Sequence, residues 1–449
     1  MARTSESYLR KTRTLARDSS PPEEAGISNH EGSPRTLNGT RFPQVGVLAL
    51  VPDWWGPEWQ ARHHVLSRLA RHFQVLWVNP ARSWRERGGQ EDHARAGLDN
   101  GSVPAGFDVY TPERWLPLLY RPAALARWTL SMRLRRARAK LIARGATTIV
   151  LYIWRPEYAP ALEFGDYDVS SYHIDDEYSF SPTDVPISET ERELIAAVDQ
   201  VFVHSPGLLE KKGDINPHTD IVPLGVDYER YAANLPEPTD LEAIPHPRIG
   251  YIGVLKRTID WPLLQFLAEQ RPEWSLVLMG PWTSVKRIEG PIGELSRLPN
   301  VFVLPAHPTS EVAPYPQHLD VCLLPYVAND YAKYGYPLKL HEYLAGGRPV
   351  VGTRMRSLED FTDVVTLAST QEEWVAGVEK ALGRDEQGLA RVAARRAVAR
   401  AHDWEILVDR IAAGIAGRVG GEVAAGYADA GGVRITSPHE SSTSATPWP

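Results

Sequence analysis

Short apolar runs alternate with longer amphipathic segments along the first half of the chain. The amphipathic segments predict helices at 59–72, 122–144, 189–198 and 205–212. Strands that alternate with helices are the pattern of parallel α/β units. We therefore predict a Rossmann-like, doubly wound first domain. Its predicted strands are Val45–Val51, Phe73–Val78, Thr148–Trp154, Asp168–Ile174, Gln200–His204 and Asp220–Val222.

A second series of the same kind follows. It predicts helices at 261–271, 311–318, 339–345 and 370–382. Two doubly wound domains in tandem would face each other across a cleft, and ligands of such sheets bind at the carboxyl ends of the strands. The predicted fold class is thus α/β with two Rossmann-like domains. The predicted strands of the second domain are 248–252, 275–279, 301–304, 321–324, 349–353 and 364–367.

Segments that lose this periodicity divide the chain. Ser, Arg, Pro and Gly dominate both ends, so we predict disordered tails. A Pro-rich stretch between the two series is the predicted linker, and a helix after the second series is predicted to return to the first domain. No apolar segment follows the early arginines, so we do not expect a secretory signal. The predicted parts are tail 1–42, domain 43–230, linker 231–247, domain 248–402, helix 403–418 and tail 419–449.

The composition narrows the class of protein. The 449 residues are 43% hydrophobic and 23% charged, which is typical of a soluble globular protein, and we expect a cytoplasmic location. The single cysteine, Cys322, excludes an internal disulfide framework and a cysteine-based metal cluster. A net charge of -7 argues against nucleic-acid binding through an overall positive potential.

The segment from Tyr334 to Val351 carries the most informative chemistry. Pro337 suits the first turn of a helix, and Gly346 and Gly347 suit its end. The N-terminus of this short helix would offer N–H groups to a phosphate, Lys339 would add a cation, and Glu342 could accept hydrogen bonds from a ribose. The alternative is a short helix whose lysine and glutamate are only solvated.

With this segment, the chain resembles the GT-B glycosyltransferases of the family-one/family-four type, and among them the teichuronic-acid and exopolysaccharide biosynthesis glycosyltransferases. Members commonly carry two glutamates separated by seven residues. Here Glu342 is the second, but Tyr334 stands at the position of the first. The pattern Pro337-x-Lys339-x-x-Glu342 looks like the branch in which the lysine contacts the donor diphosphate.

The resemblance extends to the start of the second domain. The first loop of a donor domain is similar to Gly250-Tyr-Ile-Gly253 followed by the basic pair Lys256 and Arg257. The alternative is a plain strand-to-helix turn, which has the same sequence pattern. The loops 278–282 and 306–308 would lie around the nucleotide base. The donor-binding residues that the resemblance implies are Gly253, Lys256, Arg257, Gly280, Tyr334, Lys339, Leu340 and Glu342.

Carboxylates that follow a strand are the candidates for catalysis. Asp175 and Asp176 come directly after the strand that ends at Ile174, and glycosyl transfer needs a group that orients the acceptor hydroxyl or accepts its proton. We rank Asp175 first and Asp176 second; the alternative is that they cap the next turn. A metal site with Glu177 is conceivable, but the resemblance implies no metal and no further cofactor.

Two other features suggest an acceptor. Trp54 and Trp55 follow the first strand, and aromatic faces there, with His63 nearby, could bind a sugar or lipid; ordinary loop packing is the alternative. The helix 122–144 is rich in arginine and follows an apolar segment, so it could rest on an anionic membrane surface at the inner face of the plasma membrane. The alternative is a solvated helix.

The resemblance implies transfer of a sugar from a uridine or guanosine diphosphate sugar to a hydroxyl of a glycan or polyprenyl-linked acceptor, in cell-surface polysaccharide synthesis. Two other functions stay open at this point. One is a sugar-nucleotide epimerase on the same fold. The other is a noncatalytic sugar-nucleotide-binding protein, which the tyrosine at position 334 would suit. Fold alone does not decide between them.

Overall fold

The computed structural model describes residues 39–56, 59–82, 103–119, 121–164, 166–179, 181–281 and 286–428. The predicted tails therefore lie outside the described residues at 1–38 and 429–449. The elements of the first domain are β1 (Phe42–Leu50), α2 (Ala61–Leu69), β2 (Phe73–Val78), β3 (Phe107–Tyr110), α3 (Ala123–Ala143), β4 (Thr148–Ile153), η2 (Pro156–Tyr158), α4 (Ala161–Phe164), β5 (Val169–Ile174), α5 (Glu189–Ala197), β6 (Gln200–Val203), α6 (Pro206–Lys212), η3 (Gly213–Ile215) and β7 (Thr219–Ile221).

Two short helices, α7 (Tyr228–Ala232) and α8 (Thr239–Glu242), lead to the second domain. Two helices follow it, α16 (Trp404–Val419) and α17 (Gly421–Ala428). The elements of the second domain are β8 (Arg248–Ile252), α9 (Trp261–Gln270), β9 (Ser275–Met279), α10 (Lys286–Leu295), β10 (Val301–Leu304), η4 (Thr309–Glu311), α11 (Pro314–Gln317), β11 (Val321–Leu324), η5 (Ala332–Tyr334), α12 (Lys339–Ala345), β12 (Val350–Thr353), η6 (Arg356–Phe361), β13 (Val365–Ala368), α13 (Gln371–Leu382), α14 (Arg384–Gln387) and α15 (Leu389–Ala401).

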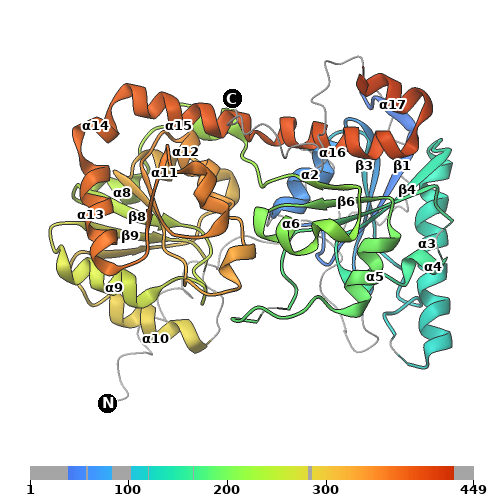
Figure 1. The fold of residues 1–449 in the computed structure, drawn as a ribbon, viewed down its shortest axis with the longest axis horizontal. Helices are drawn as coiled ribbons and strands as arrows, with labels where there is room; N and C mark the ends of the chain where they lie inside the picture. Colours follow the sequence, from blue (N-terminus) through green and yellow to red (C-terminus); the bar gives the residue numbers. More distant parts are fainter. Residues whose placement is uncertain are drawn as a thin grey trace, which may run out of the picture. The chain divides into compact units, whose positions relative to one another are not determined.

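Both sheets are parallel and doubly wound (Figure 1). The first has the strand order β3-β2-β1-β4-β5-β6-β7 and the second β10-β9-β8-β11-β12-β13. The order reverses between β1 and β4 and again between β8 and β11, and such switch points are where open α/β sheets bind ligands. The predicted fold class is confirmed.

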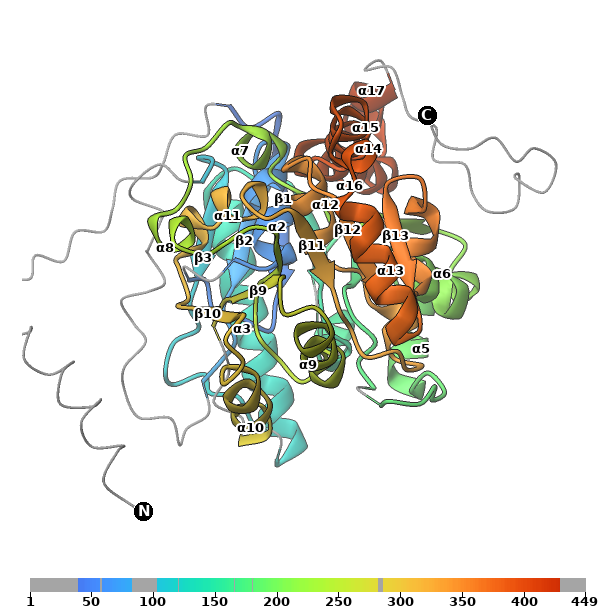
Figure 2. The same ribbon diagram turned by 90° about the vertical axis from the view of Figure 1, so that its left-hand side faces the viewer.

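Alternating side chains of each strand build two cores per sheet. In β1, Val47 and Ala49 pack on the face that α2 and α16 cover, whereas Leu48 and Leu50 pack on the face of α3 and α5. The second sheet is covered in the same way, by α9, α10 and α13 on one face and by α12 and α15 on the other (Figure 2). Burial on both faces explains why the strands read as continuous apolar runs.

Two connections between the domains lie side by side. Val226, after β7, pairs with Asp403 at the start of α16: the Val226 N–H donates to His402 O (3.0 Å) and the Trp404 N–H to Val226 O (3.0 Å). Helix α16 then packs against α2 and β6, with Leu407 and Ile411 fully buried in the core of the first domain.

Some elements differ from those predicted. The strand β3 and the helices α10 and α15 had not been predicted, and the linker 231–247 contains α8. Helix α17 lies within the predicted tail 419–449. It is ordered because the Tyr427 ring packs on Phe42, with 5.8 Å between centroids, and its hydroxyl is hydrogen bonded to His72 Nδ1 (2.6 Å). Phe42, predicted as the end of the first tail, begins β1.

Candidate functional site

Lys339 is the clearest ligand-binding candidate, and α12 places it at the switch point of the second sheet. Its side chain crosses the backbone of Gly253, the residue after β8: a Cβ atom on Gly253 would lie 1.6 Å from Lys339 Cε. The ammonium group lies 5.7 Å from the centroid of the Tyr251 ring. Within the described ranges, Lys339 forms no ion pair, so its charge is available to an anion.

Two glycines shape the loops beneath this lysine. Gly253 and Gly280 have φ angles of +147° and +144°, which side chains other than glycine rarely adopt. The Gly253 N–H donates to Met279 O (2.7 Å), and a Cβ on Gly280 would lie 2.1 Å from Gly253 O. The ends of β8 and β9 therefore approach backbone to backbone, and the Lys339 side chain lies directly over Gly253.

Glu342 lies one turn after Lys339 and is half-buried. Burial raises the pKa of its carboxyl group, while the Lys339 charge and a hydrogen bond with the Tyr231 hydroxyl act in the opposite direction. Glu342 therefore faces both Lys339 and α7, with part of its accepting capacity already used by Tyr231.

Lys256 and Arg257 are exposed on the loop after β8. The pKa of Lys256 is lowered, first by desolvation and then by the Lys339 charge, and Asp176 opposes this shift. Lys256 therefore interacts electrostatically with Lys339 of its own domain and with Asp176 of the first domain.

Asp176 follows β5 and meets the second domain directly. It accepts a hydrogen bond from the Tyr331 hydroxyl, which comes from the segment before η5. Burial is the largest influence on Asp176 and raises its pKa, and the Tyr331 hydrogen bond only partly offsets that rise. No ion pair of Asp176 is formed within the described part of the chain, so it is the more basic of the two predicted carboxylates.

Asp175 is held in a different way. Its carboxylate accepts hydrogen bonds from Arg62 Nη2 (2.5 Å) and from the Tyr178 hydroxyl (2.9 Å), and Arg62 also pairs with Asp53. Burial alone would raise the pKa of Asp175, but the Arg62 charge, with His173, holds it below its ordinary value. Asp175, our first choice as base, is therefore an ionised, buried partner of Arg62.

Two predicted donor residues lie elsewhere. Tyr334 is 4% exposed and packs on the first domain, where its hydroxyl donates to Asp184 (2.7 Å) and its carbonyl accepts from Ser205 Oγ (2.7 Å). Leu340 is fully buried in the core of the second domain, and its N–H donates to Pro337 O (3.0 Å). Both predictions are wrong for the side chains, because these residues provide packing.

Of the three acceptor candidates, two are buried in the core and one is partly exposed. Trp55 and His63 are each 1% exposed, and their rings pack together with 5.3 Å between centroids in the core of the first domain. Burial, and then the Arg62 charge, lower the pKa of His63 to about 3. Neither can contact an acceptor. Trp54 remains half-buried, under the Arg82 guanidinium at 4.8 Å from its ring centroid.

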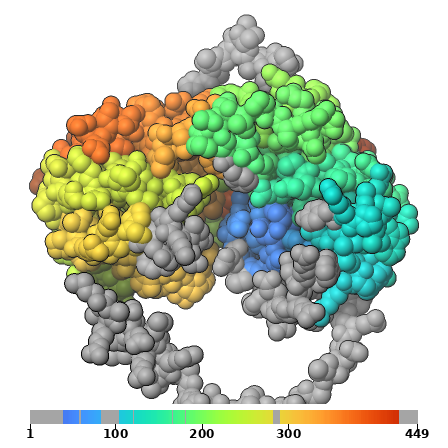
Figure 3. Space-filling model, turned by 90° about the horizontal axis from the view of Figure 1, so that it is seen from below, coloured from blue at the N-terminus to red at the C-terminus, as the bar shows by residue number. Residues whose placement is uncertain are grey.

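The surface is hollowed between the two domains. Figure 3 shows this hollow between the yellow and orange atoms of the second domain and the green and cyan atoms of the first, with blue atoms from the beginning of the first domain within it. His204 is buried next to β5, where its ring nitrogen is hydrogen bonded to Ile174 O (3.1 Å). Its charge acts to lower the pKa of both Asp175 and Asp176.

Arg62, Tyr331 and Tyr251 are the site residues that sequence reasoning missed. Arg62 and Asp175 are 113 residues apart and Tyr331 and Asp176 are 155 apart, so no local pattern relates them. For metals, no group of three or more His, Cys, Asp or Glu residues in the described ranges is arranged to hold an ion. The expectation of metal-independent chemistry stays a prediction.

Comparison with known proteins finds relatives of the segment that holds the second-domain candidates. Residues 246–384, which hold all the second-domain candidates, match the family described as Glycosyl transferases group 1. Over this segment, the chain is similar to the group 1 glycosyl transferases. Over 238 residues, the chain is 32% identical to the putative teichuronic acid biosynthesis glycosyltransferase TuaH of Bacillus subtilis. The alignment covers 50% of this chain and 58% of that relative, so it spans little more than half of the relative's length.

Solved structures resemble the described fold beyond this segment. Anabaena Alr3699/HepE, solved with UDP and glucose, has a TM-score of 0.61 at 15% identity, over 82% of this chain and 98% of its own. Sucrose-phosphate synthase from Thermosynechococcus elongatus has a TM-score of 0.59 at 15% identity, over 82% and 97%. At this identity the likeness shows the fold, which is the GT-B arrangement of two parallel α/β domains.

Proposed function

We propose that the protein is a glycosyltransferase that moves a sugar from a nucleoside diphosphate sugar to a hydroxyl of a glycan or polyprenyl-linked acceptor. The observation that carries this proposal is the Lys339 ammonium group over the glycine loop of Gly253, which has no ion-pair partner among the described residues. The name of the B. subtilis relative supports a cell-surface polysaccharide product. The UDP in the Anabaena structure supports a uridine diphosphate donor, and a guanosine diphosphate donor is the alternative.

The reaction would use the two sides of the site differently. The acceptor oxygen forms a bond to the anomeric carbon, the bond from that carbon to the diphosphate oxygen breaks, and the hydroxyl proton must leave. Lys339, with Lys256 and Arg257, would neutralise the departing diphosphate. Asp176 would accept the proton, because burial raises its pKa toward the range in which a general base is effective. Asp175 would keep the loop in place through Arg62.

The test is titration of the purified full chain with a panel of uridine and guanosine diphosphate sugars, followed by measurement of donor hydrolysis. We expect one donor to bind and to be slowly hydrolysed. Asp176→Asn should keep donor affinity within about twofold and lower hydrolysis by about 100-fold or more, which is the scale of general-base catalysis. Neither binding nor hydrolysis of any member of the panel would contradict the proposal.

The same experiment separates the alternatives. An epimerase would convert the donor into an isomeric sugar nucleotide without an acceptor, and a noncatalytic binding protein would bind the donor without any turnover. The names of the similar proteins are those of a glycosyltransferase and a synthase, so they favour neither alternative.

We also propose that α3 contacts an anionic membrane surface. Trp115 and Trp128 are 51% and 49% exposed, and their rings lie 6.5 Å apart between centroids, with the Arg136 guanidinium 4.9 Å from the Trp115 ring. Exposed aromatic rings beside arginines suit the headgroup region of a bilayer. None of the described helices combines the length and apolar composition needed to cross a membrane.

Sedimentation with vesicles tests this contact. The chain should co-sediment with phosphatidylglycerol vesicles and not with phosphatidylcholine vesicles, and Trp115→Ala with Trp128→Ala should weaken that binding. Equal recovery with both lipids, or no effect of the double variant, would favour the solvated-helix alternative.

A further inference from the structure

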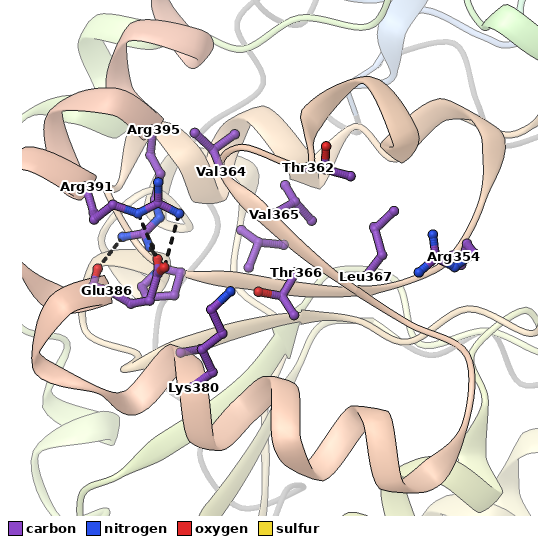
Figure 4. Close-up of a pocket in the computed structure, with 13 residues that line it drawn as sticks. Arg354, Thr362, Val364, Val365, Thr366, Leu367, Lys380, Glu386, Arg391 and Arg395 are labelled. Carbon is purple, nitrogen blue, oxygen red and sulfur yellow. Dashed lines mark hydrogen bonds and ion pairs between the residues drawn. The ribbon is translucent and has the colours of Figure 1, made fainter.

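A second cavity lies in the second domain, along β13, the edge strand of its sheet (Figure 4). Its volume is about 220 Å³, and β13, the end of α13, α14 and α15 provide most of its walls. None of the residues that we propose for the donor lines it. The volume is below the range of about 300 to 1,000 Å³ that is usual for drug-sized ligands, so the cavity suits a smaller one.

The lining is strongly positive. Four cations line the cavity, Arg354, Lys380, Arg391 and Arg395, together with a single carboxylate, Glu386. Glu386 is already saturated: both of its oxygens accept from Arg391 at 3.1 Å, and Arg395 pairs with it as well. The remaining cations have no such partner, since neither Arg354 nor Lys380 forms an ion pair within the described residues. The cavity therefore carries excess positive charge.

The donors converge on one part of the cavity. In Figure 4 the Lys380 ammonium points toward the Thr366 hydroxyl, on the same side as the Arg391 guanidinium. Arg395 is 1% exposed and donates to Glu386 O (2.7 Å), and its buried Nε has no hydrogen-bond partner in the part of the chain that the structure describes. Ammonium, guanidinium and hydroxyl groups together form the donor set that binds tetrahedral oxyanions.

We propose that this cavity binds a small phosphate-bearing anion, a phosphate monoester of about the size of a sugar phosphate. Lys380 supplies the free charge and Thr366 a neutral hydrogen bond, beside the Arg391 guanidinium that Glu386 holds in place. The ligand is distinct from the nucleoside diphosphate sugar, and the site is independent of the proposed reaction.

Calorimetric titration of the full chain with inorganic phosphate and with glucose 1-phosphate, at constant ionic strength, tests the proposal. Since Lys339 would also attract phosphate, the titrations are made in the Lys339→Ala variant. We expect both probes to bind with millimolar or tighter affinity, the ester at least as tightly as inorganic phosphate. Adding Lys380→Gln should weaken binding by about tenfold and adding Thr366→Val by about threefold, as expected for one charge-assisted and one neutral hydrogen bond.

Arg384→Gln is the matched control, because it removes the same charge from an exposed position of α14 that does not line the cavity. It should change affinity less than twofold. Three results would overturn the proposal: no binding of either probe in the Lys339→Ala variant, binding of inorganic phosphate with exclusion of the ester, or an equal effect of Lys380→Gln and Arg384→Gln. None of these results depends on whether a sugar nucleotide binds or reacts.

Discussion

The carboxyl ends of the two sheets hold their charged side chains in opposite ways. In the first domain, Arg62 is 6% exposed and pairs with both Asp53 and Asp175. In the second domain, Lys339 lies over Gly253 without a partnering carboxylate within the described residues. The first site supplies ion-paired counter-charges, whereas in the second Lys339 and its neighbour Glu342 form no ion pair in the described residues, which leaves the lysine for an anion from outside. This difference is why we assign the diphosphate to the second domain and a neutral hydroxyl to the first.

Arg62→Met should have the largest effect on stability of all the variants that test this difference. It leaves Asp53 and Asp175 without their cation, and removal of one partner of a buried pair costs about 3 to 5 kcal/mol. Denaturant unfolding should therefore show a free energy of unfolding lower by about that amount. Arg257→Met, which removes an exposed cation from the donor side, should change it by about 0.5 kcal/mol or less. Similar losses in both variants would show that the two sides are not built differently.

Lys339→Ala should give the largest effect on binding. Loss of a charge-assisted hydrogen bond to the diphosphate should weaken donor affinity by about 100-fold, or about 3 kcal/mol, with little change in the free energy of unfolding. Calorimetric titration with the best donor of the panel measures it. The exposed Arg384→Ala serves as control, and an unchanged donor affinity in Lys339→Ala would contradict the assignment.

Acid should destabilise the protein through histidines buried beside the first-domain carboxylates. Burial is the main cause that lowers the pKa of His63 and of His173 to about 3. Below pH 6.5 the unfolded chain binds protons that the folded chain does not, so this stability is complete above pH 6.5 and is lost as the pH falls toward 3. At pH 5, each of these histidines should lower the free energy of unfolding by about 2 kcal/mol.

Unfolding at pH 7.5 and pH 5.0 measures this loss. Other buried histidines, such as His341 in the second domain, contribute with the same sign, so the His63 share is isolated by His63→Gln. Between the two pH values, the free energy of unfolding of this variant should fall by about 2 kcal/mol less than that of the original chain. An identical loss would mean that His63 is not protonated on unfolding in this range.

Lys256→Gln should have the smallest effect. Lys256 is exposed, so its contribution is screened by water and salt, and donor affinity should fall by about threefold to tenfold at low salt and less at high salt. Titration at two salt concentrations measures it. A loss as large as that of Lys339→Ala would show that the two lysines act as one unit.

The sequence predicted the second sheet well, for a physical reason. The strands 248–252, 275–279, 301–304 and 321–324 were placed at their observed bounds, because strands buried on both faces are unbroken apolar runs between polar segments. Helix α15 had no such contrast, since its sequence alternates alanine and arginine and only Arg395 and Ala399 are buried.

The site was predicted less completely than the fold. Lys339 and Gly253 were found because a helix start and a glycine turn are local features. Trp55 and His63 were predicted to be accessible to an acceptor but are buried. The sequence of a loop does not show whether an aromatic side chain turns toward the core or toward solvent. Tyr334 lies on the first domain through Asp184, 150 residues away, and no pattern within one segment reveals such a contact.

The most direct measurement of the central claim is a crystal structure of the full chain with UDP. It should show a diphosphate oxygen about 3 Å from Lys339 Nζ, above Gly253, with the ribose toward Glu342. Nucleotide bound elsewhere, with Lys339 unchanged and its ammonium group free of phosphate, would contradict the account.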